Sequence, residues 1–514
     1  MLAIINSLAL RGIDANLIKV EVDVSSGLPG FNIVGLPDTS VREASERVRA
    51  AVKNTGFEFP AKRITINLAP ADLKKEGSGL DLPIAIGILA ATGQIAGDII
   101  QTSYFIGELS LDGSLRSVPG VLPMACALSQ PDNSNKFLIV PEANGFEAAL
   151  AGTIPVLSVK NLQQVAGMIT GQLPLNPLAV RVEDFFLQKN SESLDFSEVY
   201  GQNGVKRALE IAAAGGHNVL MIGSPGSGKT MLAKRIASIL PNLTIDEALS
   251  ISKIYSSSGL LNSQDPLISK RPFRAPHHTA STASLIGGGK FPRPGEISLA
   301  QEGILFLDEL PEYRKDVLEA LRQPLEDRIV TISRISGTVS YPASFMLVAA
   351  MNPCPCGYYG DSEKECVCTP YQIQKYRNKL SGPLLDRIDI QIEVPRLKYE
   401  DLESNLPSET SQEIKLRVEK ARSIQRKRFK ETGLNSNSQM THKLIPVHCV
   451  TTKKAKLLLH KAFQKLGLSM RAHDRILKIA RTIADLAEKD IINDEHLAEA
   501  IHYRMLDRQK NIFS

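Results

Sequence analysis

The sequence predicts an α/β protein built from two α/β units and a C-terminal helical segment. Strand-like and helix-like runs alternate over residues 1–172, and a second alternation, from about residue 195, contains a glycine-rich loop between a strand and a helix. A polar segment near residue 400 then precedes an amphipathic helical pattern. Because 514 residues exceed what one ordinary core accommodates, several domains are expected.

The first unit, residues 1–172, alternates two kinds of apolar run. The run RITINLA is typical of a strand, whereas VREASERVRAAVKN is typical of a helix. A polar, proline-containing stretch at 173–194 is expected to be a linker. The expected strands lie at 17–24, 63–69 and 136–143, and the expected helices lie at 41–54 and 82–95.

The second unit spans residues 195–398, and the helical segment follows at 399–514. Within that segment, TSQE at 410–413 has the spacing of a capping box, in which threonine and glutamate side chains cap the first turn of a helix. The pattern therefore predicts an amphipathic helix. Its apolar face consists of Ile414, Val418, Ala421 and Ile424.

Charge and hydropathy argue against several classes of protein. The 60 basic and 55 acidic residues give a net charge of only +5, which excludes a polybasic DNA-wrapping protein but not local basic surfaces. The N-terminal run lacks the basic region and the cleavage site of a signal peptide. The longest apolar run, 82–93, is shorter than the roughly 20 residues that span a bilayer. We therefore expect a cytoplasmic protein without membrane contact.

The segment GSPGSGKT matches the phosphate-binding loop G-x-x-x-x-G-K-[ST], between the expected strand NVLMI and the expected helix MLAKRIASIL. Glycines let the backbone curl so that its N–H groups and the helix N-terminus face phosphates. Lys229 is expected to reach the β- and γ-phosphates of ATP, and the Thr230 hydroxyl to bind Mg²⁺. The expected ATP-binding residues are Gly223, Ser224, Pro225, Gly226, Ser227, Gly228, Lys229 and Thr230.

Two carboxylates end the strand-like run GILFLDEL. Asp308 is suited to contact Mg²⁺ directly or through water, and Glu309 is suited to polarise the attacking water. A strand with a solvated acidic end is the alternative for a lone Asp-Glu pair, but here the pair follows a phosphate loop. The next such run, FMLVAAMNP, leads to Asn352, whose amide either orients the same water or has no catalytic role.

The order of these motifs resembles that of AAA+ ATPases, specifically the magnesium-chelatase-like branch. The segments at 200–230, at 272–281 (PFRAPHHTAS) and at 382–390 (GPLLDRIDI) strengthen this similarity. With the first unit included, nearly the whole chain is similar to the ComM/YifB family, bacterial AAA+ proteins linked to DNA uptake and branch migration. The resemblance implies a Lon-protease-like α/β domain, an AAA+ P-loop α/β domain and a helical lid.

Three residues take their roles from this resemblance. Asn352 matches the sensor 1 residue, Arg387 matches the arginine finger that reaches a neighbouring subunit's γ-phosphate, and Arg471 matches sensor 2 in the lid. Because an arginine finger acts across a subunit interface, the family implies a homo-hexameric ring. Considered from the residues alone, Arg387 fits an ion pair with Asp386 or Asp389 equally well.

Two segments of the second unit are candidates for DNA contact. The segment 328–342 predicts a hairpin with Arg334 near its tip, where related ATPases carry a pore hairpin. The segment 281–296 resembles a second inserted loop, with Lys290 beyond a glycine hinge. Basic side chains on such loops suit sequence-independent phosphate contacts, but a solvated charge explains each residue equally well. The basic helix at 415–430 is expected to be a solvated face.

Four of the six cysteines cluster in one short segment, 354–368. Four thiolates can complete a tetrahedral Zn²⁺ site, although C-x-C pairs are less typical of zinc sites than C-x-x-C pairs. A structural zinc ion here would pin the loop between Asn352 and Arg387, whereas the alternative is an ordinary loop with reduced thiols. The candidate ligands are Cys354, Cys356, Cys366 and Cys368.

The first unit resembles Lon-type protease domains in the order of its motifs KEGSGLDL, GELSLDGSLRSVPGVLPMA and FLIVPEAN. That family uses a serine–lysine dyad, in which the amine deprotonates the serine. The resemblance places Gly79, not Ser78, at the nucleophile position, and no lysine occurs where the family has its base. It therefore implies a catalytically inactive domain that serves as a ring scaffold or as a DNA-guiding collar.

These features are compatible with three functions to different degrees. The first is an ATP-driven DNA translocase or helicase that promotes branch migration during homologous recombination in natural transformation. The second is a chelatase-type motor that remodels a partner protein, but such subunits typically lack a Lon-like domain. The third, an ATP-dependent protease, fails because the dyad is missing. The sequence therefore favours an ATPase that acts on branched DNA.

Overall fold

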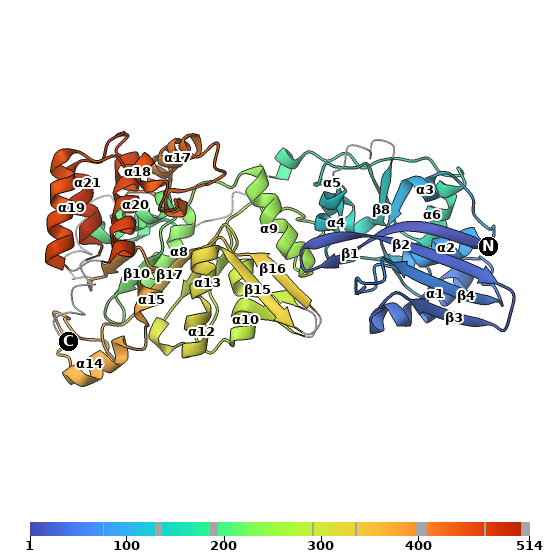
Figure 1. Ribbon diagram of the computed structural model, residues 1–514, viewed down its shortest axis with the longest axis horizontal. Helices are drawn as coiled ribbons and strands as arrows, with labels where there is room; N and C mark the ends of the chain where they lie inside the picture. Colours follow the sequence, from blue (N-terminus) through green and yellow to red (C-terminus); the bar gives the residue numbers. More distant parts are fainter. Residues whose placement is uncertain are drawn as a thin grey trace. The chain divides into compact units, whose positions relative to one another are not determined.

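The computed structural model describes residues 1–75, 77–128, 136–185, 194–289, 292–334, 337–396, 409–466 and 469–504. The chain divides into two compact units, each with its own sheet (Figure 1). The first unit comprises Met1–Lys189 and Thr244–Ser269, and the second comprises Asn190–Leu243 and Lys270–Ser514. A segment from the middle of the chain thus completes the first unit.

A mixed sheet is the framework of the first unit, with the strand order β3-β4-β2-β1-β5-β8-β9 among the described residues. β1 (Leu2–Arg11) and β2 (Asp14–Ser25) pair antiparallel around a tight turn in which Gly12 has a φ of 70°. Every second side chain of β2 from Ile18 to Val24 is buried, as expected for a strand with one face on the core. The apolar N-terminal run is therefore a strand of the sheet. The other strands are β3 (Gly30–Val34), β4 (Arg63–Ala69), β5 (Ser103–Phe105), β8 (Phe137–Pro141) and β9 (Val156–Val159), beside a hairpin of β6 (Glu108–Leu109) and β7 (Leu115–Arg116).

The helix α2 (Asp81–Ala91) packs on β1 and β2 and is buried over nearly its whole length. Gly87 permits this approach, because a Cβ there would lie 2.5 Å from Cγ2 of Val22. α9 (Ile245–Ser257), from the later segment, packs on α4 (Val121–Ala127), and the Gly120 N–H donates to the Ser256 carbonyl at 2.9 Å. The other helices are α1 (Thr39–Asn54), α3 (Ile99–Thr102), α5 (Gly145–Ala149) and α6 (Leu162–Ile169).

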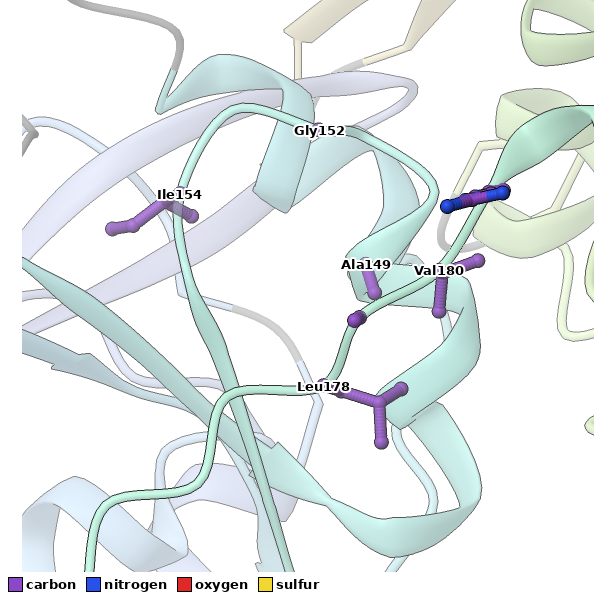
Figure 2. Close-up of a pocket in the computed structure, with 7 residues that line it drawn as sticks. Ala149, Gly152, Ile154, Leu178 and Val180 are labelled. Atoms are coloured by element: carbon purple, nitrogen blue, oxygen red, sulfur yellow. The ribbon is translucent and has the colours of Figure 1, made fainter.

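An open pocket of about 480 Å³ lies in the first unit beside α5 (Figure 2). The stretch after α6 forms one side of it and is tied to the sheet, because the Leu178 N–H donates to the Val156 carbonyl at 2.9 Å. None of the lining residues is a carboxylate, a histidine or a cysteine, so the pocket offers no acid–base or metal-binding group. The lining residues are Ala149, Gly152, Ile154, Leu178, Ala179, Val180 and Arg181.

A parallel sheet forms the centre of the second unit. Its order among the described residues is β11-β14-β17-β10-β18. β17 lies between β10 and β14, and because all strands are parallel, the segments that follow them meet at one edge of the sheet. The strands are β10 (Val219–Ile222), β11 (Phe273–Arg274), β14 (Ile304–Leu307), β17 (Met346–Met351) and β18 (Ile390–Glu393), beside the hairpins of β12 (Gly287–Gly288) with β13 (Arg293–Pro294) and of β15 (Ile329–Arg334) with β16 (Gly337–Pro342).

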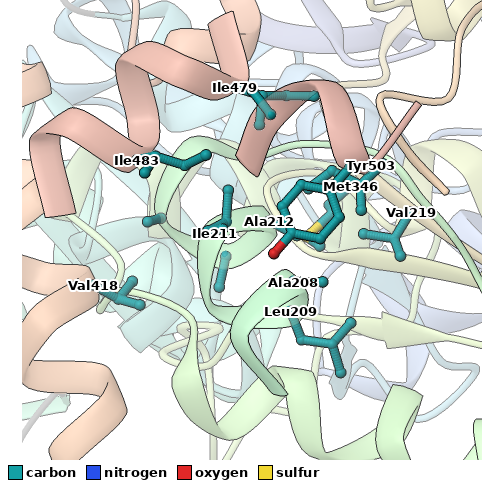
Figure 3. Packing of buried hydrophobic residues seen from close by; sticks show 14 of the residues in the cluster. Ala208, Leu209, Ile211, Ala212, Val219, Met346, Val418, Ile479, Ile483 and Tyr503 are labelled. Carbon is teal, nitrogen blue, oxygen red and sulfur yellow. The ribbon is translucent and has the colours of Figure 1, made fainter. Parts of the chain in front are cut away.

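The C-terminal helices pack on the core of the second unit (Figure 3). α17 contacts α7 and α8, and α20 contacts α7. The expected capping box begins α17, with reciprocal hydrogen bonds between Thr410 and Glu413. No helix of the described residues has the length and apolar character needed to cross a membrane. The helices are α7 (Asn203–Gly215), α8 (Lys229–Ile239), α10 (Thr282–Ile286), α11 (Glu296–Leu299), α12 (Lys315–Ala320), α13 (Arg322–Asp327), α14 (Pro370–Arg377), α15 (Gly382–Leu385), α17 (Ser411–Arg428), α18 (Ile445–His448), α19 (Lys453–Leu466), α20 (Met470–Leu486) and α21 (Asp494–His502).

A buried polar network joins the helix α20 to the sheet. His217, just before β10, contacts the Thr482 hydroxyl through Nε2 at 2.8 Å, and its Nδ1 lies 3.6 Å from Asp389 Oδ2. Arg475 of α20 donates to the other oxygen of Asp389 at 2.8 Å. Burial raises the pKa of Asp389, but Arg475 and His217 outweigh burial and hold that pKa well below its ordinary value.

Candidate functional site

The phosphate loop, residues 223–228, joins β10 to α8 at the carboxyl edge of the second sheet. Gly228 precedes α8 with a φ of 89°, in the left-handed region that favours glycine. Gly223 is required for a different reason, because a Cβ there would lie 2.4 Å from the Val394 carbonyl oxygen. The loop thereby leads into the N-terminus of α8, where backbone N–H groups and the helix dipole favour a phosphate.

Lys229 is buried beneath this loop. Its Nζ donates to the carbonyl oxygens of Gly223 and Ser224 at 2.7 and 2.9 Å, and to Asn352 Oδ1 at 3.3 Å. Burial lowers the pKa of the ammonium, while the two carboxylates after β14 oppose that effect. Asn352 follows β17, so the strand order places its amide beside the lysine.

Thr230 and Asp308 meet across the edge of the sheet. Thr230, in the first turn of α8, donates its hydroxyl to Asp308 Oδ2 at 2.7 Å. Asp308 follows β14, which only β17 separates from β10. Adjacent hydroxyl and carboxylate oxygens of this kind fit Mg²⁺, which takes few protein ligands and completes its shell with phosphates and water.

Glu309 lies in the turn after β14 with a φ of 51°, which is uncommon for a residue other than glycine. Its Oε2 is 3.2 Å from Nδ1 of His278. His278 also makes an edge contact with Tyr313, whose hydroxyl donates to the Pro276 carbonyl at 2.6 Å. Burial raises the pKa of Tyr313, and the neighbouring carboxylates raise it further. Sequence reasoning missed His278, because only the fold brings PFRAPHHTAS to Glu309.

Arg387 and Arg471 lie outside this constellation. The Arg387 guanidinium forms an ion pair with Glu326 of α13. Burial lowers the pKa of Arg387, and the nearby Arg471 lowers it further. Asp389, one of the two partners considered from the sequence, pairs with Arg475 instead. Within the described residues, no hydrogen bond or ion pair joins Arg387 or Arg471 to the phosphate loop.

Comparison with known proteins shows to which family the chain belongs. The family model described as magnesium chelatase, subunit ChlI, matches residues 195–402, a second ChlI model matches 20–144, and the ChlI C-terminal model matches 408–504. Competence protein ComM of Haemophilus influenzae is 46% identical over 511 residues, which are 99% of this chain and 98% of that protein. The uncharacterized protein YifB of Escherichia coli is 45% identical over the same shares.

The chain belongs to the ComM/YifB family of magnesium-chelatase-like proteins. Part of this ComM/YifB chain is also similar to Lon protease 2 of Bacillus subtilis, with 27% identity over 210 residues, which are 37% of this chain and 36% of that protein. The predicted fold class is therefore confirmed: an α/β protein with Lon-like and AAA+ similarity and C-terminal helices. Membership in this AAA+ branch indicates an ATPase that uses ATP and Mg²⁺.

The four clustered cysteines of this ComM/YifB protein converge between β17 and α14. Their sulfur atoms lie within 4.8 Å of one another, with Cys354 at 3.4 Å from Cys356 and 3.7 Å from Cys366. Four sulfurs about 2.3 Å from a tetrahedral Zn²⁺ would stand about 3.8 Å apart. With Cys368 as fourth donor, the set fits a metal ion such as zinc.

The two segments considered for DNA contact are neighbours in this ComM/YifB protein. β15 and β16 form the expected antiparallel hairpin, with Arg334 opposite Gly337. Nη2 of Arg334 lies 3.3 Å from the point that a Cβ on Gly288 of β12 would occupy. Lys290 lies outside the described residues. The structure thus places one of the two predicted basic residues at the junction of both hairpins.

In the first unit of this ComM/YifB protein, Ser78 has an acidic partner. The Ser78 hydroxyl donates to a carboxylate oxygen of Glu108. Lys75, the lysine nearest to Ser78 in the sequence, is buried, and its ammonium donates to a backbone carbonyl. Asp81, at the start of α2, accepts two hydrogen bonds from Arg47 at 2.7 and 2.9 Å. Within the described residues, no amine contacts Ser78.

Proposed function

We propose that this chain is an ATP-hydrolysing motor that assembles as a hexameric ring and drives branch migration of recombination intermediates. The Thr230–Asp308 contact carries the proposal, because it lies beside Lys229 and Asn352 in the arrangement that a site for phosphates and Mg²⁺ requires. The name of competence protein ComM supports a process in natural transformation.

Each residue of the constellation has its own task in this proposal. Lys229 and the N–H groups of the phosphate loop hold the β- and γ-phosphates. Glu309 polarises the attacking water, and Asn352 orients it. Mg²⁺ bound by Thr230 and Asp308 supplies charge neutralisation at the phosphates.

Two arginines complete the ATP site in this proposal, one from a neighbouring subunit and one from the helical lid. Arg387 acts in trans as an arginine finger on the γ-phosphate held by a neighbouring subunit. This role is supported by the lack, within the described residues, of a hydrogen bond or ion pair between Arg387 and the phosphate loop of its own subunit. Arg471 acts as sensor 2 from the helical lid. A finger of this kind stabilises charge that develops as the γ-phosphoryl group leaves. The ring is therefore part of the catalytic mechanism.

In this proposal the DNA contacts come from the segments 281–296 and 328–342. Arg334 and Lys290 bind backbone phosphates without reading sequence, as a translocase requires. The four cysteines hold a structural Zn²⁺. The domains are the inactive Lon-like scaffold at 1–172, a linker at 173–194, the AAA+ core at 195–398 and the lid at 399–514; Ser78, paired with Glu108, supports the scaffold role.

The decisive experiment is ATP-dependent migration of a three- or four-strand DNA junction by the full-length protein. The wild-type protein is expected to migrate the junction, and the Lys229→Ala protein is expected to leave it unchanged. Lys234→Ala is the matched control, because Lys234 lies on the same helix with an exposed side chain. A wild-type protein that hydrolyses ATP but migrates no junction would contradict the proposal.

A second function, a chelatase-type motor that remodels a protein partner, is favoured by the match of the ChlI model to residues 195–402. Both functions use the same ATP site, so ATP hydrolysis alone does not separate them. Branched DNA should stimulate the ATPase of a branch-migration motor, whereas a protein-remodelling motor would bind no DNA and would respond only to its partner.

A further inference from the structure

The cysteine loop, defined here as residues 353–369, touches the phosphate loop. Gly357 has a φ of 88°, and a Cβ at this position would lie 2.6 Å from Cδ and 2.7 Å from Cγ of Pro225. Pro225 belongs to the phosphate loop itself. The backbone of the cysteine loop therefore packs directly against the segment expected to hold the nucleotide phosphates.

A polar contact joins the same two loops. The Ser224 hydroxyl donates to Oδ2 of Asp361. The other oxygen of Asp361 accepts from the backbone N–H groups of Glu363 and Lys364 at 2.9 and 3.1 Å, so the cysteine loop fixes its own aspartate. Ser224 in turn accepts from Lys229 through its carbonyl at 2.9 Å. A continuous path leads from the cysteine loop to the lysine.

The segment that makes these contacts has no helix or strand of its own. Residues 357–365 lie between the two C-x-C pairs, and the four sulfur atoms close this segment into a ring-like turn. An ion bound by all four thiolates would remove most of the conformational freedom of the segment, because it fixes both ends at one point. Without the ion, holding Asp361 and Gly357 in place would cost that entropy.

We infer that metal loading of the four-cysteine site sets the nucleotide affinity of the phosphate loop, through Asp361 on Ser224 and Gly357 on Pro225. The inference rests on the proposed function, in that the phosphate loop is taken to bind ATP. The cysteine site is then a metal-dependent brace of the ATP site. Its occupant is a soft-to-borderline divalent cation, of which Zn²⁺ fits four thiolates best.

The experiment measures the affinity of the full-length protein for Mg·ATP by calorimetry, in the absence of DNA, together with the zinc content of each preparation. Asp361→Ala is expected to keep its zinc and to lose about tenfold in affinity, the effect of one hydrogen bond to a charged group. Glu365→Ala is the matched control, because Glu365 is an exposed carboxylate of the same loop. It should keep both zinc and affinity.

Two further variants separate the brace from a general loss of folding. Cys366→Ser should lose zinc and bind Mg·ATP at least as weakly as Asp361→Ala. Asp361→Ala introduced into a Ser224→Ala background should cause no further loss of Mg·ATP affinity, because each change removes the same hydrogen bond between Ser224 and Asp361. A zinc-loaded Asp361→Ala protein with wild-type affinity, or additive losses in the double variant, would overturn the inference.

The outcome is distinguishable from failure of the proposed function. Zinc-dependent binding of Mg·ATP by a protein that migrates no DNA junction would leave the brace intact and remove the DNA role. Junction migration by a folded Cys366→Ser protein that lacks zinc and binds Mg·ATP with wild-type affinity would support the DNA role and exclude the brace.

Discussion

The imidazole of His278 lies 3.2 Å from the carboxylate of Glu309, so two segments that are distant in the sequence meet at the carboxyl edge of the second sheet. His278 follows β11 and Glu309 follows β14, and these strands are parallel neighbours. The turns after both strands therefore share one edge of the sheet. Glu309, in its unusual left-handed conformation, thus gains an orienting partner from outside its own turn.

His278→Ala is expected to lower kcat of the ATPase by about tenfold, because a misplaced carboxylate polarises the attacking water less well. The affinity for Mg·ATP should not change, since His278 contacts Glu309 and not the phosphate loop. His442→Ala is the control, because the His442 imidazole pairs with Asp474 and not with Glu309. Steady-state kinetics of both variants give the answer, and a wild-type kcat in His278→Ala would disprove the orienting role.

Glu309→Gln is expected to bind ATP normally and to lose at least about a hundredfold in turnover, since the amide cannot accept a proton from water. Glu312 lies in the same turn, and its carboxylate pairs with Lys379. The Glu312→Gln variant should therefore retain most of the ATPase activity. Binding by calorimetry and turnover by phosphate release separate the two effects. Normal hydrolysis by Glu309→Gln would exclude Glu309 as the base.

Local patterns were enough to predict most of the elements that carry the site. The runs at 63–69 and 41–54 are β4 and most of α1, and the strand before the phosphate loop is β10. Each pattern depends on residues close in the sequence, either alternating burial or helical spacing. The hairpin of β15 and β16 was predictable for the same reason.

Contacts between distant segments could not be predicted in this way. Nothing in the sequence near His278 indicates Glu309 as its neighbour, and nothing near Asp361 indicates Ser224. Such pairs follow from the strand order, in which β17 lies between β10 and β14. The same limit applies to α9, which comes from the middle of the chain and packs within the first unit.

Mixing two inactive variants should restore ATPase activity if Arg387 acts in trans. In a mixed ring, an Arg387→Ala subunit has an intact phosphate loop, and a Lys229→Ala neighbour provides an intact arginine. Some interfaces then contain both groups, so activity should rise from near zero to a measurable fraction of wild type. Glu326→Gln, which removes the partner of Arg387 within its own chain, should stay active. No recovery on mixing would contradict the trans assignment.

Asp389→Asn should destabilise the second unit at neutral pH by about 3 kcal/mol, because it removes the buried carboxylate that pairs with Arg475. The pKa of Asp389 is depressed in the folded chain, so its contribution is complete above the unfolded value of about 3.9 and is lost as the pH falls toward the folded pKa. The difference between the thermal midpoints of wild type and variant should be complete at pH 7 and should narrow progressively as the pH falls below about 4. Asp386→Asn is the control, and a difference at about pH 3 as large as that at pH 7 would refute the linkage.

Arg334→Ala should weaken DNA binding about equally for all sequences, because a guanidinium on a hairpin contacts phosphates and not base edges. The slope of log affinity against log salt concentration should fall by about one, which is the signature of one lost phosphate contact. Lys420→Ala is the matched control, since Lys420 lies exposed on α17, in the basic helix expected to be only solvated. Fluorescence anisotropy at several salt concentrations measures both slopes. An unchanged slope in Arg334→Ala, or an equal fall in slope in Lys420→Ala, would contradict a DNA contact at this hairpin.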